Sequence, residues 1–295
     1  MRPPRRLAHR AGRTRDPPPL AHTGGRTRDP PPLALRGGRT RDPPPLALTG
    51  ERTLPGIPDE RYWYERHLVA YRLAAAKAAH RQVLDAGCGE GYGADLLAAA
   101  GASRVVGVDL DLAAVAHVAR TYPAVAAVRA ELSRLPFEDG RFDLVVSLQV
   151  IEHVWDVPRY LASLARVLRP DGELLLATPN RLTFSPVSAP LNPFHVREFA
   201  PDELVEELAS AGLRVGSVLG VHHGARLRTV ERLLRRPLPQ VLAATPPARW
   251  PAGMRALVHR VGTAWFQVRA DRLHDSLDLI ALCRAPRPSG SRKPS

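Results

Sequence analysis

The sequence predicts an α/β fold with a doubly wound, mostly parallel sheet. Its clearest element is the stretch VLDAGCGEGYG at residues 83–93, an apolar strand that ends in an acid and runs into glycines before an Ala/Leu-rich helix. A second strand over residues 104–108 is closed by Asp109 and completes a βαβ unit. Residues 142–148 form a β-branched, apolar run typical of a strand buried in a parallel sheet. Strands that alternate with helices favour such a sheet, with helices on both faces.

Capping and turn residues place the other elements. Pro58 and Asp59 are start signals for a first helix, Pro158 follows Asp156 at the start of a later one, and Gly212 stops another. The expected elements, in order, are helices from 58 to 79 and from about 91 to 101, a helix after Asp111, a strand at 125–128, the turn at 169–172, a strand at 174–177, a helix from 201 and a strand at 213–219.

Charge is unevenly distributed along the 295 residues, whose net charge is +13. Residues 1–50 hold 11 basic and 3 acidic residues, residues 51–220 hold 17 and 22, and residues 221–274 hold 10 and 2. The predicted core is therefore acidic, and the basic excess lies outside it. We therefore do not expect nucleic acid as the main partner, although total charge alone would suggest it.

The two cysteines, Cys88 and Cys283, lie far apart in sequence and form neither a disulfide framework nor a CxxC metal motif. Such usage fits a reducing compartment, and we expect a cytoplasmic protein. The basic N-terminal region has no apolar stretch behind it, and no run of about 18 apolar residues exists. Secretion and membrane spanning are therefore not expected.

The first 48 residues carry the ten letters GRTRDPPPLA three times, starting at Gly12, Gly25 and Gly38. Proline triplets cannot donate backbone hydrogen bonds, and each unit has one leucine to bury, so residues 1–48 are expected to be disordered. A proline-rich docking arm is the alternative, but no unit contains P-x-x-P. The identical copies indicate either a recent duplication of coding DNA or a misassigned start, and we hypothesise that the working protein begins near Thr49.

The glycine loop and the two strand ends after it carry the candidate chemistry. Residues 89–94 satisfy G-x-G-x-x-A, so these residues alone leave a dinucleotide-dependent hydride transfer open. Asp109, 22 residues after Gly87, could bind ribose hydroxyls, whereas Asp109 or Asp111 could instead cap the next helix. Gln149, Glu152 and His153 follow the strand at 142–148, at the sheet edge where open α/β sheets bind ligands.

Aromatic residues gather at the head of the first helix. Tyr62, Trp63, Tyr64 and Tyr71 lie in one helical stretch. They could cover a bound cofactor, or they could pack on the core as helical aromatic residues usually do.

The ordered blocks LPF at 135–137, EH at 152–153 and LRPDG at 168–172 resemble those of the class I S-adenosylmethionine-dependent methyltransferases, over about residues 49–220 plus a closing strand. The resemblance implies S-adenosylmethionine as cofactor and argues against the dinucleotide alternative. It also implies a seven-stranded, Rossmann-like sheet with an antiparallel last strand, here residues 275–282. The implied cofactor-binding residues are Asp85, Gly87, Cys88, Gly89 and Gly91 in the loop, Asp109, which would bind the ribose, Glu131, which would bind the adenine amino group, and Leu110, Leu132 and Gln149.

Three longer segments, TGERTLPGIPDERYW, QVIEHVWD and the block at 178–199, resemble actinobacterial methyltransferases associated with methylated polysaccharides. This resemblance implies a small-molecule or saccharide hydroxyl as acceptor. Some related O-methyltransferases bind a divalent metal through E-x-x-E-H, whereas this chain has Gln149 at the first position. Because an amide is a poorer ligand for a hard cation, we expect no metal dependence.

A hydroxyl acceptor needs a base, and histidine suits neutral pH because its unperturbed pKa is about 6.5. His153 is the first candidate and His195 the second, with Glu152 orienting a histidine or binding acceptor hydroxyls. Each histidine could instead be a structural hydrogen-bonding residue. His222 and His223 are weaker candidates.

Residues 221–274 are expected to form a basic helical insertion before the last core strand at 275–285, followed by a disordered tail at 286–295. One predicted helical stripe contains Leu227, Val230, Leu233 and Leu234, and a second contains Met254, Leu257, Val258, Val261, Trp265 and Val268. The insertion could be a cap beside the acceptor site, or its arginine face could contact an anionic lipid, glycan or RNA. An RNA methyltransferase and a non-catalytic cofactor-binding protein remain alternative functions, and the sequence predicts no oligomeric state.

Overall fold

The structure, a computed structural model, describes residues 46, 52–185 and 194–285. The chain divides into two units, residues 1–42 and 43–295, and all described residues belong to the second. Apart from residue 46, the predicted disorder of residues 1–48 and 286–295 therefore falls outside the described residues, as does part of the block at 178–199.

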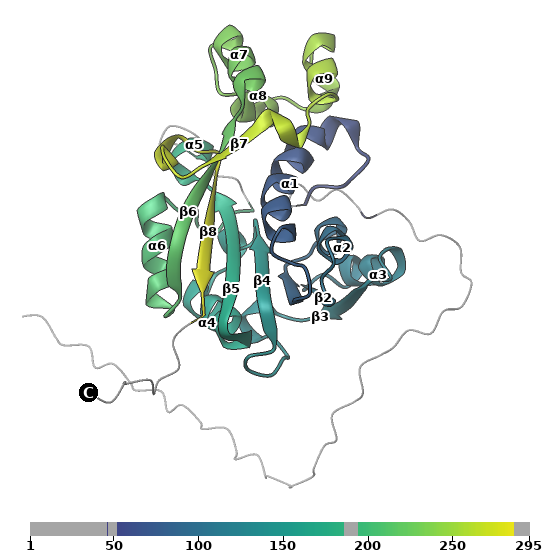
Figure 1. Cartoon of the computed structure of the whole chain (residues 1–295). Coiled ribbons are helices and arrows are strands. Elements are labelled where there is room, and N and C mark those ends of the chain that lie inside the picture. Colours follow the sequence, from purple (N-terminus) through teal and green to yellow (C-terminus); the bar gives the residue numbers. More distant parts are fainter. Residues whose placement is uncertain (1–45, 47–51, 186–193, 286–295) are drawn as a thin grey trace, which may run out of the picture. The chain divides into compact units, whose positions relative to one another are not determined.

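One sheet organises the described residues (Figure 1). Its strands are β1 (Gln82–Ala86), β2 (Arg104–Asp109), β3 (Val125–Arg129), β4 (Phe142–Leu148), β5 (Leu168–Pro179), β6 (Arg214–His223), β7 (Phe266–Arg269) and β8 (Asp278–Arg284). The order is β3-β2-β1-β4-β5-β8-β6-β7, with β1 to β5 parallel and β8 antiparallel between β5 and β6. The predicted α/β class and mostly parallel sheet are confirmed.

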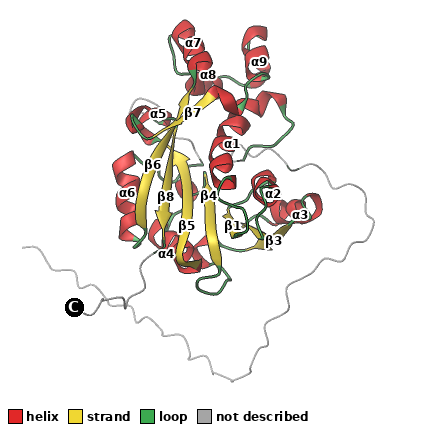
Figure 2. Cartoon of the chain, viewed as in Figure 1, coloured by secondary structure: helices red, strands yellow, loops and turns green. Residues whose placement is uncertain are grey.

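Helices cover both faces of the sheet (Figure 2). Alternate residues of a strand enter different apolar clusters, so that Val83 joins the cluster under α1, α2 and α3 whereas Leu84 joins the cluster under α4 and α6. The helices are α1 (Arg61–Ala75), α2 (Tyr92–Ala99), α3 (Leu112–Thr121), α4 (Val157–Val167), α5 (Arg181–Phe184), α6 (Pro201–Ser210), α7 (Ala225–Leu234), α8 (Leu238–Ala244) and α9 (Ala252–Val258). No helix in the described part of the chain is long and apolar enough to cross a bilayer.

The expectation of seven strands is wrong, because the described sheet has eight. β6 runs on to His223, beyond the predicted end at Leu219, and its extension pairs with the additional short strand β7 in antiparallel register. The second predicted helical stripe, from Met254 to Val268, is also wrong, because β7 occupies its end. α9 ends at Val258, and the stripe's last residue, Val268, lies in β7. A four-residue strand at a sheet edge gives too little alternation to be recognised from sequence.

A buried ion pair fastens α1 to the antiparallel strand β8. Arg66 donates from Nε to Asp278 Oδ2 over 2.6 Å and from an Nη to Oδ1 over 2.5 Å, and both side chains are buried. The same guanidinium also donates to the carbonyl of Leu277. A second buried link joins Tyr62 of α1 to His223 at the end of β6 over 2.7 Å. These contacts set where α1 lies over the ends of the strands.

Replacing Arg66 with methionine is expected to lower the free energy of unfolding by about 3–5 kcal/mol, because the Asp278 carboxylate then stays buried without its partner. The double variant Arg66→Met/Asp278→Leu should recover most of this loss, since no unpaired charge remains. Urea unfolding measures both. Arg272→Gln, which breaks an exposed pair with Asp275, is the control and should cost less than about 1 kcal/mol. An equally small loss for Arg66→Met would contradict the assigned role of the buried pair.

Candidate functional site

The glycine loop between β1 and α2 is shaped by backbone angles that only glycine adopts easily. Gly87, Gly89 and Gly91 have φ values of +88°, +54° and +104°. A Cβ on Gly87 would lie 2.4 Å from Val150 Cγ2, so no larger residue fits there. A Cβ on Gly89 would meet nothing within 4 Å. The loop thus closes against Val150 at one end and leaves open space at Gly89.

This open space belongs to a cavity of about 620 Å³ beside the carboxyl ends of β1, β2 and β4, where open α/β sheets bind ligands. Its volume suits a ligand of cofactor size. The predicted residues that line it are Gly87, Cys88, Gly89, Asp109, Leu110, Glu131, Leu132, Gln149 and His153. The structure therefore brings predicted residues from four separate segments together around one space.

Asp85 and Gly91 do not line this cavity. Gly91 is the N-cap of α2. The Asp85 carboxyl is fully buried and accepts a hydrogen bond from the Tyr71 hydroxyl, with oxygen distances of 3.2 and 3.4 Å. Burial raises the pKa of Asp85 to about 7. Both residues support the wall of the cavity from behind.

The sequence left open which of the two acids after β2 caps the next helix and which faces a ligand. Asp111 caps α3 by accepting from Ala113 N over 2.8 Å, and it also pairs with Arg52. Asp109 lines the cavity, and its carboxylate accepts from the backbone N–H of Gly89 over 2.9 Å. Because each carboxylate oxygen has two lone pairs, Asp109 can hold the loop and still accept from a ligand hydroxyl.

Part of the cavity wall was not predicted from the sequence, namely Arg52, Thr53, His67, Glu90, Tyr92 and Trp155 among others. Of the aromatic residues on α1, Tyr71 lines the cavity, whereas Tyr62 is fully buried in the core. Burial lowers the pKa of His67 to about 4, so its ring is neutral at physiological pH. Glu90 and Tyr92 lie in the glycine loop and Trp155 in the segment QVIEHVWD, whereas no local motif marks His67, because only the fold brings α1 over the strand ends.

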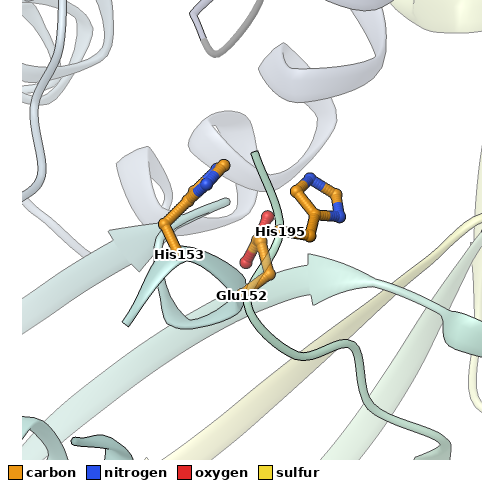
Figure 3. A group of neighbouring side chains, drawn as sticks. All are labelled: Glu152, His153 and His195. Atoms are coloured by element: carbon orange, nitrogen blue, oxygen red, sulfur yellow. The ribbon is translucent and has the colours of Figure 1, made fainter. Parts of the chain in front are cut away.

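At one edge of the cavity, Glu152, His153 and His195 come together (Figure 3). Figure 3 shows the Glu152 carboxyl group between the two imidazole rings, whose centroids are 5.0 Å apart. One ligand-type atom from each residue lies within 4.8 Å of the others. His153 lines the cavity itself, whereas Glu152 and His195 do not. The three predicted catalytic residues are thus neighbours, although 42 positions separate His153 from His195 in sequence.

Hydrogen bonds fix both imidazole rings. His153 Nδ1 lies 2.7 Å from the carbonyl oxygen of Phe194. A carbonyl can only accept, so Nδ1 carries the proton and Nε2 is the basic nitrogen. His195 Nδ1 lies 2.6 Å from Oε1 of the buried Glu198, and the His195 ring stacks on Phe184. Glu198 was not predicted from the sequence, although the spacing H-x-x-E was an available signal.

Glu152 is a buried carboxyl group with 1% of its surface exposed. It accepts a hydrogen bond from the Thr178 hydroxyl over 2.9 Å, and burial raises its pKa to about 8. Its backbone carbonyl accepts from the N–H groups of Val196 and Arg197. Glu152 therefore ties the segment that carries His195 to the end of β4.

Gln149, the residue that argued against a metal, has a φ of +57° and donates from its side-chain amide to Asp278 over 3.3 Å. The donor set at the cluster is a carboxyl group with a raised pKa and two imidazoles, of which one is bonded to Glu198. These three groups meet the distance requirement for a cation, so the expected metal independence stays a prediction that needs its own test.

The stability of the protein should depend on pH through Glu152. Its pKa is raised in the folded state, so the folded chain binds more protons than the unfolded chain between about pH 4.5 and 8, and stability falls as pH rises through this window. Glu152→Gln removes this term while keeping an acceptor for Thr178. The variant's gain in unfolding free energy over the native chain should therefore grow from pH 5 to pH 8, measured by denaturant unfolding. An equal pH dependence for both proteins would contradict this prediction.

Comparison with known proteins identifies the family. A family model described as a methyltransferase domain matches residues 84–176. A probable S-adenosylmethionine-dependent methyltransferase of Mycobacterium tuberculosis is 46% identical over 241 residues, covering 79% of this chain and 88% of that protein. A similarly described protein of Mycolicibacterium smegmatis is 47% identical over 240 residues, covering 79% and 93%. A ubiquinone biosynthesis O-methyltransferase of Chelativorans sp. is 32% identical over 157 residues, covering 48% of this chain and 61% of that protein.

The fold has solved counterparts as well. A chain in the complex of the Haloferax volcanii Trm112 methyltransferase activator with a methyltransferase aligns with a TM-score of 0.51 and 20% identity, covering 77% of this chain and 92% of that one. This likeness supports the fold, and the mycobacterial relatives support the family along most of their length. The chain therefore belongs to the S-adenosylmethionine-dependent methyltransferases, and S-adenosylmethionine is its cofactor.

Proposed function

We propose that this enzyme transfers the methyl group to a hydroxyl of a small, saccharide-like acceptor in the cytoplasm. The observation that carries the proposal is the position of His153, whose basic Nε2 belongs to a ring that lines the cofactor cavity. A hydroxyl must lose its proton during methylation, and a histidine in this tautomer can accept it. The free, buried thiols of Cys88 and Cys283 support a reducing compartment.

The residues of the cavity fit the cofactor. The space in front of Gly89 lets the backbone approach a ligand closely, and the Asp109 carboxylate beside it suits ribose hydroxyls. Leu110 is 61% exposed at the cavity, an apolar surface that an adenine ring would cover. When bound, the cofactor supplies an electrophilic methyl group on a positively charged sulfur.

The protein's own task is then to hold the acceptor in line and to remove one proton. Positioning supplies most of the acceleration in such a two-substrate transfer. His153 Nε2 takes the hydroxyl proton as the new carbon–oxygen bond forms. His195 is oriented by Glu198 next to the His153 ring and is the second candidate base. Glu152 holds the His195 segment through its backbone carbonyl.

Two exposed aromatic side chains favour the proposal that the acceptor is ring-shaped. Trp155 is 88% exposed although it lines the cavity, and Phe194 is 43% exposed next to His195. Flat aromatic faces that stay partly open at a binding site suit the apolar face of a sugar ring. The partial similarity to ubiquinone biosynthesis O-methyltransferases supports an oxygen acceptor.

The acceptor class is tested by incubating the full chain with methyl-labelled S-adenosylmethionine and a mycobacterial extract, then separating carbohydrate, lipid, RNA and small molecules. Label in carbohydrate or small molecules, recovered after acid hydrolysis as an O-methyl ether, is the expected result. Label in RNA would overturn the proposal and favour an RNA methyltransferase. Tight cofactor binding with no label in any fraction would favour a non-catalytic protein.

Gly89→Ala is expected to weaken S-adenosylmethionine binding at least tenfold, because the added methyl group enters the space where the backbone approaches the ligand. Gly101→Ala is the matched control. Gly101 also has a positive φ, of +88°, and open space at its Cβ, but it lies outside the cavity. Both variants should lose about 1 kcal/mol of stability, and only Gly89→Ala should lose affinity in calorimetry. Equal affinities would contradict the assignment of the cavity.

His153→Gln is expected to lower kcat by about 10²–10⁴ with little change in cofactor affinity, the usual loss for a general base. Glu198→Gln should lower kcat less, since it changes only the group that orients His195. His222→Gln, on a histidine outside the cavity lining, is the control and should leave kcat unchanged. If His195→Gln lowers kcat more than His153→Gln does, His195 is the base and the assignment of His153 is wrong.

Methyl transfer is expected to continue at an unchanged rate after dialysis against EDTA, because Gln149 directs its amide to Asp278 and adds no ligand to the three candidate groups of the cluster. The rate is measured before and after adding back Mg²⁺, Mn²⁺ or Zn²⁺. A strict requirement for one of these ions would overturn the prediction and make Glu152, His153 and His195 its ligands.

A further inference from the structure

The outer side of α7 is strongly basic. Helical spacing places Arg226 and Leu233 on one side of the helix with Arg232 beside them, and Arg235, the C-cap, and Arg236 follow directly after its last residue, Leu234. All five side chains are exposed, and we call them the basic face. The opposite side carries Leu227, Val230 and Leu234, which pack on the core. One side of α7 thus packs on the core, and the basic face is exposed to solvent.

The charges of the basic face are not neutralised within the described part of the chain. Arg232, Arg235 and Arg236 make no hydrogen bond or ion pair there, and Arg226 lies over the Trp265 ring at 5.3 Å. The only acid of α7, Glu231, is turned the other way. Its carboxylate contacts His223 Nδ1 over 3.0 Å and the backbone N–H of Leu238 over 2.9 Å. The face therefore suits a partner with many negative charges.

The exposure of Leu233 indicates which kind of anionic partner the basic face fits. The Leu233 side chain is 81% exposed among the arginines, although exposing an apolar side chain to water is unfavourable. An exposed aliphatic side chain flanked by arginines is the pattern of helices that lie at a lipid interface, where the chain inserts and the guanidinium groups stay at the phosphates.

RNA is a weaker fit for the same face. Proteins that bind single-stranded RNA stack bases on exposed aromatic rings. Among the aromatic residues of 221–274, Trp250 and Phe266 are buried and Trp265 is half-buried next to Arg226. The described part of this segment thus exposes a leucine where an RNA-binding surface would expose a ring.

We propose that the basic face of α7 docks the enzyme on an anionic phospholipid bilayer. In Figure 1, α7, α8 and α9 stand together beyond the ends of the strands, so α7 can meet a flat surface. With one leucine inserted, the attraction is mainly electrostatic and weakens as salt screens it. This docking does not depend on the identity of the methyl acceptor.

The test is co-sedimentation of the full chain with vesicles at about 0.1 M salt. The vesicles are pure phosphatidylcholine, or phosphatidylcholine with about one-third phosphatidylglycerol. Only the anionic vesicles should bind the native chain. The triple variant Arg232→Gln/Arg235→Gln/Arg236→Gln should bind them at least about tenfold less, since each arginine near the surface adds to the attraction.

The matched control removes the same charge elsewhere. Arg13→Gln/Arg15→Gln/Arg28→Gln changes three arginines of the N-terminal repeats and should keep most of the binding. Equal losses for the two triple variants would overturn the proposal and leave only non-specific attraction by net charge. Binding to single-stranded RNA that depends on the α7 arginines, with vesicle binding unaffected, would also overturn it. Cofactor affinity, measured for every variant, shows that each remains folded.

A second measurement places Leu233 in the bilayer. The native cysteines, Cys88 and Cys283, are buried, so Leu233→Cys can be labelled selectively with a polarity-sensitive fluorophore. Its emission should shift to the blue on anionic vesicles. Leu112→Cys on α3, at a leucine with similar exposure of 60%, is the control and should not shift. No shift at position 233 would show that the leucine stays in water and would contradict docking through this face.

Discussion

The buried pair of Arg66 and Asp278 is the interaction on which the arrangement of the site depends. It joins the helix that covers the strand ends to the antiparallel strand in the sheet, across 212 residues of sequence. Asp278 also accepts from the Gln149 amide, so the same carboxylate reaches a residue of the cavity wall. A buried ion pair contributes little net stability compared with apolar packing, so its value here is positional. It fixes α1, and with it His67 and Tyr71, over the cofactor cavity.

Two further buried acids are held by hydrogen bonds and not by an ion pair. Asp85 lies at the end of β1 and Glu152 just after β4, neither forms an ion pair within the described residues, and burial raises both pKa values. Each accepts a hydrogen bond from one hydroxyl, from Tyr71 and Thr178 respectively. A neutral carboxyl group can donate as well as accept, which lets such a group link two segments where a charge would need hydration. The strand ends are thus joined by polar contacts that carry little net charge.

The sequence predicted the parts of the structure that depend on neighbouring residues. Apolar runs ending in Asp85 and Asp109 predicted two adjacent strands, and the glycines predicted the loop between them. Parallel strands end at the same edge of a sheet, so the meeting of Gly89, Asp109 and His153 at one cavity followed from topology. The helix caps at Asp111 and Asp156 were predicted for the same local reason.

Contacts between distant segments could not be predicted in this way. No pattern pairs Arg66 with Asp278, or turns α1 so that His67 lines the cavity. Glu198 is local to His195, but only the structure shows that this pair lies beside His153. The short strand β7 was missed because pairing with the extended end of β6, and not propensity, creates it.

A crystal structure with S-adenosylhomocysteine would show whether the cavity presents the cofactor to a basic His153. We expect ribose hydroxyls on the Asp109 carboxylate, the adenine against Leu110, and the sulfur facing His153 Nε2 across a gap of roughly 5–7 Å, enough for one acceptor hydroxyl. A sulfur that faces away from His153, or an acceptor channel that opens elsewhere, would contradict this expectation.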